Sequence, residues 1–140
     1  MAPLYENEVS FYNRIRPELD LETPRSFGAG FDAETSDFAI VLEDLAQRGA
    51  SFSNVLMPVS LDNVRSLLSQ QAKLHARFWQ SPRRGHHMHD VSYLVTTALS
   101  IDDRRTHEED LLRYYLECLK VEGVADVPSS KTASPNSADA

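Results

Sequence analysis

The sequence predicts an α+β fold that is mostly helical, and three observations carry this prediction. Long runs with the apolar spacing of one helix face fill residues 60–79 and 101–122. Before the first run, two short apolar segments lie on either side of a polar turn, which is typical of a β-hairpin. The apolar share of 41% in 140 residues is sufficient for a core of modest size.

The first expected element is a short helix at Tyr5–Arg16. Glu6 and Glu8 lie in its early turns, where negative charge suits the helix dipole. Pro17 is expected to end it, because the residue before a proline avoids helical geometry. The apolar residues that share one face are Tyr5, Val9, Tyr12 and Ile15.

Two strands are expected next, at Ser26–Phe31 and Phe38–Leu42, with a turn at Asp32–Asp37. The second segment is rich in branched apolar residues and is expected to be a buried strand. Gly28 and Gly30 lack the spacing of a phosphate-binding loop, so we interpret them as a bulge or a close backbone contact. Residues 47–59 are expected to be irregular.

The longest regular element before residue 100 is a helix at Ser60–Trp79. The Ser60 hydroxyl is expected to cap its first turn, and Pro82 forbids continuation soon after its end. His75 lies beside the apolar stripe, and a packed histidine is the preferred interpretation over a catalytic one. The apolar residues are Leu61, Val64, Leu67, Leu68, Ala72, Leu74, Phe78 and Trp79.

Two further helices are expected at about 90–99 and 101–122. Ser100 with Asp103 resembles a capping box, and Gly123 is placed as a C-terminal stop. Cys118 is interpreted as a small buried hydrophobe. The apolar positions of the last helix are Leu111, Leu112, Tyr115, Leu119 and Val121. Residues 127–140 are poor in apolar side chains and are expected to be disordered.

Composition excludes several classes of function. A net charge of −7 and a pI near 5.1 argue against a nucleic-acid-binding surface and against electrostatic membrane binding. No apolar run is long enough to span a bilayer, and no signal peptide is visible at the N-terminus. One cysteine cannot form an internal disulfide, so a cytoplasmic location is expected.

A cluster of histidines raises the question of a metal site. His86, His87 and His89 with Asp90 are residue types that bind zinc. Adjacent ligands in one loop are poorly placed to form a tetrahedron, so solvated or helix-start histidines are the preferred interpretation and no metal is expected. Nothing around any serine is typical of a nucleophile elbow.

Several segments follow one another in an order that resembles a known superfamily. The resemblance covers about residues 5–127, and the ordered set is more specific than any one segment. The segments are Glu8–Tyr12, Pro24-Arg25 with Gly28, Ile40–Leu45 with Gly49, Ala72–Trp79, Gly85–Leu94 and 103–124. This set resembles the aminoglycoside phosphotransferase and choline-kinase-like superfamily, especially its ecdysteroid-kinase-like branch.

The resemblance implies a protein-kinase-like fold of two lobes, with a partial N-lobe and hinge at 1–59 and a partial helical C-lobe at 60–126, ahead of the tail at 127–140. It also implies phosphoryl transfer from ATP with magnesium to a small hydroxylated molecule. It implies that Glu8 pairs with the lysine that binds the ATP phosphates. Glu43, Asp44 and Leu45 would form the hinge, whose backbone groups bind adenine. From the residues alone, these two acids could equally form a solvated turn. Asp90 would brace the catalytic loop without binding magnesium.

The departures from the family pattern affect activity. The family's Gly-rich loop and its lysine would precede residue 1, so neither is expected here. Only Gln80–Arg84 stand where the catalytic loop and the magnesium motif belong. The sequence therefore predicts a non-catalytic fragment or pseudoenzyme. The alternatives are a protein-interaction module, with Leu67, Phe78 and Trp79 uncovered by the missing insert, and a small metalloprotein.

Overall fold

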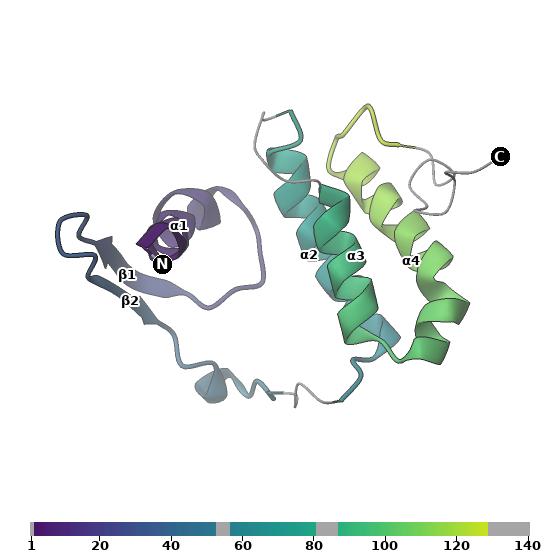
Figure 1. Ribbon diagram of the computed structural model, residues 1–140, viewed down its shortest axis with the longest axis horizontal. Helices are drawn as coiled ribbons and strands as arrows, with labels where there is room; N and C mark the ends of the chain where they lie inside the picture. The colour runs from purple at the N-terminus through teal and green to yellow at the C-terminus, as the bar shows by residue number, and fades with distance from the viewer. Residues whose placement is uncertain (1, 53–56, 81–86, 129–140) are drawn as a thin grey trace. The chain divides into compact units, whose positions relative to one another are not determined.

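The structure is a computed structural model, and it describes residues 2–52, 57–80 and 87–128. The fold is α+β and mostly helical, with a two-stranded antiparallel hairpin, which confirms the predicted class (Figure 1). The chain divides into two compact units, Met1–Phe52 and Ser53–Ala140. The sequence placed this boundary slightly later, after residue 59.

The N-terminal unit begins with helix α1, Ala2–Ser10, which continues as a π-helical turn at Phe11–Ile15 and a 3₁₀ turn at Arg16–Glu18. The predicted helix is present, but Pro17 does not end the helical path. It lies in the first positions of the 3₁₀ turn, where a missing N–H removes no intrahelical hydrogen bond.

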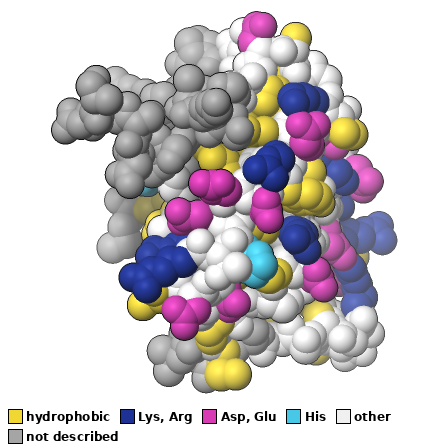
Figure 2. All heavy atoms as spheres, turned by 90° about the vertical axis from the view of Figure 1, so that its right-hand side faces the viewer, with side chains coloured by type: hydrophobic (Ala, Val, Ile, Leu, Met, Phe, Trp, Pro, Cys, Tyr) yellow, Lys and Arg dark blue, Asp and Glu magenta, His cyan; other side chains and the backbone are white. Residues whose placement is uncertain are grey.

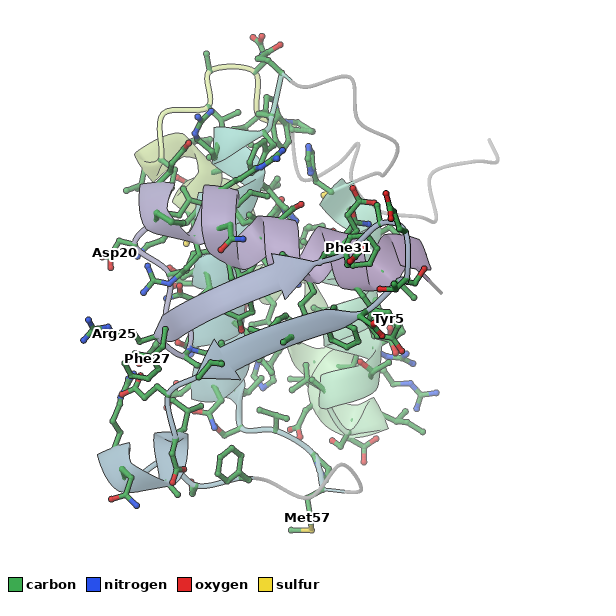
Figure 3. The ribbon with its side chains drawn as sticks, turned by 90° about the vertical axis from the view of Figure 1, so that its left-hand side faces the viewer. Tyr5, Asp20, Arg25, Phe27, Phe31 and Met57 are labelled. Carbon is green, nitrogen blue, oxygen red and sulfur yellow. The ribbon has the colours of Figure 1, made fainter. Side chains whose placement is uncertain are left out.

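The hairpin has the predicted strand boundaries, β1 at Ser26–Phe31 and β2 at Phe38–Leu42. The register shifts between Ser26 and Gly28, which agrees with the interpretation of a bulge at Gly28, whereas Gly30 pairs regularly with Ala39. The alternative of a close backbone contact is wrong, since nothing lies within 4 Å of a Cβ built at either glycine. Figure 3 looks onto the hairpin, with Phe27 at one end and Phe31 at the other. The α1 helix packs against it, and the Tyr5 ring stacks on that of Phe38 with centroids 4.0 Å apart.

The prediction that Phe38–Leu42 is a buried strand is wrong. Phe38, Val41 and Leu42 are 42%, 58% and 37% exposed. The α1 helix packs on this hairpin, and among the described residues the sheet has only these two strands. Branched apolar residues therefore give the strand its conformation here without giving it burial.

Three helices form the C-terminal unit: α2 at Leu61–Arg77, α3 at His87–Ala98 and α4 at Ile101–Val121. Ser60 accepts a hydrogen bond from the Asn63 N–H at 3.3 Å, as predicted for the cap of α2. Helix α2 ends two residues earlier than predicted, with Phe78 as its C-cap, and α3 begins three residues earlier than predicted.

The ends of α4 also follow the predicted chemistry. The Ser100 hydroxyl accepts from the Asp103 N–H at 3.1 Å and donates to the Asp103 carboxylate at 2.7 Å. After the helix, Gly123 has a φ of +91°, and its N–H donates to the Lys120 carbonyl. The Val124 N–H donates to the Leu119 carbonyl, which completes a Schellman motif.

The core of this unit lies between its three helices. Buried residues that form it are Val64, Leu68, Ala72, Val91, Val95, Leu99, Leu111, Tyr115, Leu116, Leu119 and Val124.

The assignment of Val121 to the apolar face is wrong, since its side chain is 84% exposed. Two residues beyond Leu119 correspond to a rotation of about 200°, which directs Val121 away from the core. Cys118 is only half-buried and packs at the edge of the core.

Two further expectations concern the C-terminal tail and membrane-spanning segments. Val127 packs partly against the core, and the rest of the tail predicted to be disordered lies outside the described residues beyond Pro128. None of the helices in the described ranges has the length and apolar character needed to span a bilayer. On the face of the molecule drawn in Figure 2, acidic and basic side chains are interspersed.

Candidate functional site

The predicted hinge segment directly follows β2 and is fixed by polar contacts. The Glu43 N–H donates to the Arg25 carbonyl at 2.8 Å, and the Arg25 N–H donates to the Glu43 carboxylate at 3.1 Å. The Arg48 guanidinium lies 3.1 Å from the same carboxylate. The backbone N–H of Arg25, aided by Arg48, lowers the pKa of Glu43 against the opposing effect of partial burial. Glu43 is therefore a carboxylate that fixes the segment.

Asp44 and Leu45 begin the next turn. The Asp44 carboxylate accepts a hydrogen bond from the Ala46 N–H at 3.0 Å and so caps a 3₁₀ turn at Leu45–Arg48. Gly49, with a φ of +75°, ends this turn. The two acids after the strand are thus used locally, one to tie the strand to Arg25 and Arg48 and the other as a cap.

A hollow of about 340 Å³ lies beside this turn, within the N-terminal unit. It is lined by Glu22, Thr23, Pro24, Leu45, Arg48, Gly49 and Ala50. Its volume is at the low end for small-molecule sites, and it combines an apolar wall with one cationic and one anionic side chain. It could hold a small polar molecule, and Leu45 is the predicted hinge residue that contributes to it.

Glu8, the predicted partner of a phosphate-binding lysine, lies on the exposed side of α1. Residues 1–52 contain no lysine. The structure therefore brings no lysine of the N-terminal unit to Glu8, and it does not bring Glu8 into the set of residues that line the hollow.

A second cluster lies in the C-terminal unit and joins His75 to Asp90. His75, only 5% exposed, lies with its Nε2 3.3 Å from the Asp90 carboxylate and its Nδ1 2.7 Å from the Tyr115 hydroxyl. The three residues come from α2, α3 and α4, so one side chain connects all three helices. Both residues that the sequence marked as structural thus lie in one cluster.

The protonation state of the cluster follows from its surroundings. Burial, aided by the charge of His87, lowers the pKa of His75, and Asp90 opposes this shift only in part. Burial, together with the charge of Asp90, raises the pKa of Tyr115. We therefore assign a neutral imidazole in which Tyr115 O–H donates to Nδ1 and Nε2–H donates to Asp90.

This cluster has the residue types of a catalytic relay but not the access that one requires. Tyr115 is fully buried, so no substrate atom can reach its hydroxyl. The arrangement instead satisfies two polar groups inside an apolar core, which is what buried polar groups require. The preferred interpretation of His75 as a packed histidine agrees with this geometry.

The candidate zinc site lies only partly within the described residues. His86 lies outside the described residues, and His87, His89 and Asp90 occupy the first turn of α3. The His87 ring stacks on Trp79, with centroids 5.0 Å apart. In the part of the chain that the structure describes, no group of three or more His, Cys, Asp or Glu side chains could hold a metal ion.

Sequence reasoning missed two residues of these clusters. Tyr115 was assigned only to the apolar face of α4, although a buried tyrosine usually requires a partner for its hydroxyl. His75 and Tyr115 are each a polar group at a predicted apolar stripe, and their joint occurrence was the available signal. Arg48 carries no signal of its own, because its contact with Glu43 depends on the path of the chain through the turn.

Comparisons with protein families, with curated proteins and with solved structures found no match to this chain.

Proposed function

We propose that this chain is a non-catalytic relative of the ATP-dependent small-molecule kinases, built on part of a protein-kinase-like fold. The order of elements supports the proposal: a helix packs on a hairpin, and the hairpin leads directly into the hinge segment Glu43–Leu45. The hollow beside Leu45 gives this segment a space for a small molecule, which supports the proposal. A helical unit that begins with the long helix α2 then follows, as in the family. A cytoplasmic location belongs to the same proposal.

One observation carries the absence of catalysis. Helix α2 ends at Arg77 and α3 begins at His87, so only residues 78–86 connect them. A catalytic loop and a magnesium motif together need more chain than this. Phosphoryl transfer depends on positioned metal ions and a catalytic aspartate, which the catalytic loop and the magnesium motif supply in the family. Without these groups the developing charge on the transferred phosphoryl group has no stabilisation.

An ADP-release assay tests this proposal. The purified protein is incubated with ATP, magnesium and a panel of small hydroxylated compounds, and ADP is detected by a coupled reaction. We expect no release above the protein-free blank. Turnover that rises in proportion to protein concentration would contradict the proposal.

Binding of adenosine tests whether the hollow still binds adenine, as the hinge does in the family. We expect weak binding by calorimetry that is lost in Ala50→Trp, because a large side chain would fill the hollow that Ala50 lines. Ala33→Trp is the matched control, since Ala33 is exposed in the hairpin turn. Equal binding by both variants would show that adenosine does not bind in the hollow.

A protein-interaction module on the same scaffold is the second candidate. Several large apolar side chains are exposed, among them Leu67 at 44%. Trp79, by contrast, packs against the core, so the surface predicted from the missing insert is only partly uncovered. Light scattering combined with a hydrophobic dye tests this candidate. A monomer that binds no dye would argue against it.

A further inference from the structure

The outer edge of β2 is an unpaired strand edge. Within the described residues the sheet consists of β1 and β2 alone, so each strand has one edge without a neighbouring strand. The two edges differ. On β1, the Asn13 side-chain amide donates to the Ala29 carbonyl at 3.0 Å, and the turn that carries Asn13 packs against this strand. No such contact is found on the described residues of β2.

The register shows which backbone groups this edge presents. Asp32 N–H donates to the Asp37 carbonyl at 2.8 Å, so this pair is hydrogen-bonded, and bonded and non-bonded pairs alternate from there along an antiparallel ladder. Ala29 and Ile40 then form a non-bonded pair whose N–H and C=O groups point outward. The bond from Asn13 to the Ala29 carbonyl agrees with this assignment.

Three residues of β2 therefore direct both backbone groups away from β1: Phe38, Ile40 and Leu42. At the far end, the Glu43 N–H again points inward and donates to the Arg25 carbonyl, which agrees with this alternation. The edge is thus a row of alternating donors and acceptors with the spacing of a strand. Since β2 is apolar, uncharged and free of proline, it lacks the devices that usually block strand addition.

Charge restricts what can pair with this edge. Residues 1–52 hold ten acidic side chains against four arginines. Asp37 precedes β2 and Glu43-Asp44 follow it directly. Glu43 is already paired with Arg48, but Asp37 and Asp44 leave both ends of the strand acidic. Ten acids and four arginines give this unit a net charge of −6, so two copies of it repel each other and a second copy is a poor partner.

We infer that the β2 edge binds an extended segment of another protein, with branched apolar residues in its centre and basic residues at both ends. The segment adds a third strand through the outward backbone groups of Phe38, Ile40 and Leu42. Its basic ends lie near Asp37 and Asp44. This inference deepens the second proposed function, the protein-interaction module, and does not depend on the absence of catalysis.

Fluorescence anisotropy with a labelled peptide, Lys-Val-Thr-Val-Thr-Val-Lys, tests the inference on the full chain. N-methylation of alternate residues removes only the N–H groups on one side of the peptide strand. We expect methylation of either the three valines or the two threonines to weaken binding at least about tenfold, while the other set has little effect. Replacement of both lysines by glutamate is expected to abolish binding, and added salt is expected to weaken it.

Protein variants test the same edge from the other side. Asp37→Asn should weaken binding of the lysine peptide, whereas Asp126→Asn, a matched change at an exposed site in the C-terminal unit, should leave binding unchanged. Ile40→Pro removes one outward N–H and should weaken binding, with circular dichroism used to verify that the variant remains folded.

Three results would overturn the inference. These are the absence of peptide binding, an equal effect of both methylation sets, and self-association of the chain that Ile40→Pro abolishes. The last result would assign the edge to a second copy. None of them bears on the ADP-release assay, and dye binding without peptide binding would leave the interaction module in place at another surface.

Discussion

The His75 side chain connects three helices through hydrogen bonds at opposite sides of its ring. Its partners differ in their surroundings: Tyr115 is fully buried, whereas the Asp90 side chain is 60% exposed. A lost partner costs most where water cannot replace it. The contact with Tyr115 should therefore contribute more to stability than the contact with Asp90.

Tyr115→Phe tests this contact. The substitution keeps the ring in the core but leaves Nδ1 of His75 without its donor, so we expect the free energy of unfolding to fall by about 1–3 kcal/mol. Tyr93→Phe is the control, because Tyr93 is 67% exposed and its change should stay within about 0.5 kcal/mol. Urea denaturation measures both, and equal losses would show that the hydrogen bond contributes nothing specific.

The pKa of His75 predicts how stability depends on pH. Burial and the charge of His87 lower this pKa in the folded state, although Asp90 acts in the opposite direction and Tyr115 occupies the other nitrogen. The unfolded chain, with a histidine pKa of about 6.5, therefore binds a proton more readily than the folded chain. The contribution of neutral His75 is present above about pH 6.5 and is lost as the pH falls below it.

Urea unfolding of the wild-type protein and of His75→Gln measures this dependence. The stability advantage of the wild type is expected to be larger at about pH 8 than at about pH 5. Taking the difference between the two proteins removes the titration of groups that they share. An advantage that stays constant or grows toward acid pH would contradict the assigned protonation state.

At the scale of elements, the end of α4 depends on the conformation of Gly123. Its φ of +91° is one that other residues adopt only with strain, and nothing lies within 4 Å of a Cβ built at this position. The cost of Gly123→Ala should therefore be backbone strain alone, about 1 kcal/mol. Gly123→Asn should cost less, since asparagine tolerates this conformation better. Chemical denaturation should rank the proteins as wild type, Asn, Ala, and equal stabilities would contradict this account.

Local chemistry explains why several elements were predictable from the sequence. Ser60, Ser100 and Gly123 act on backbone groups within a few residues, so the ends that they set could be predicted without the rest of the fold. The hairpin was predictable for the same reason, since a short polar turn between two apolar segments allows only antiparallel pairing.

Features that depend on distant contacts were not predictable. Burial of β2 depends on what covers its faces, and the strand sequence does not contain that information. The hollow is lined from two segments, residues 22–24 and 45–50, that are brought together only by the fold. His75 was placed on a packed face, but its contact with Tyr115 spans forty residues of chain and depends on how α2 and α4 pack.

At the scale of the whole molecule, the two units differ in charge. Residues 53–140 hold ten basic side chains against eleven acidic ones, whereas residues 1–52 carry most of the negative charge. On α4 the opposite charges are paired locally, as for Arg113 with Asp110 and Lys120 with Glu117. An attraction for basic partners therefore belongs to the N-terminal unit, which also carries the open edge of β2.

The two units also differ in the size of their hydrophobic cores, and this difference predicts how each unit folds by itself. Among the described residues of 1–52, the buried hydrophobic side chains are Val9 and Leu21, whereas residues 57–128 contain the continuous core of α2, α3 and α4. A chain of residues 53–140 should therefore unfold cooperatively on heating, with a Tm within a few degrees of the main transition of the whole protein. Residues 1–52 alone should show no cooperative transition, because about fifty residues with so little buried surface cannot offset the entropy of ordering. Circular dichroism melts of the two pieces and the whole chain measure this, and loss of cooperativity in 53–140 would show that the helical core needs the N-terminal unit.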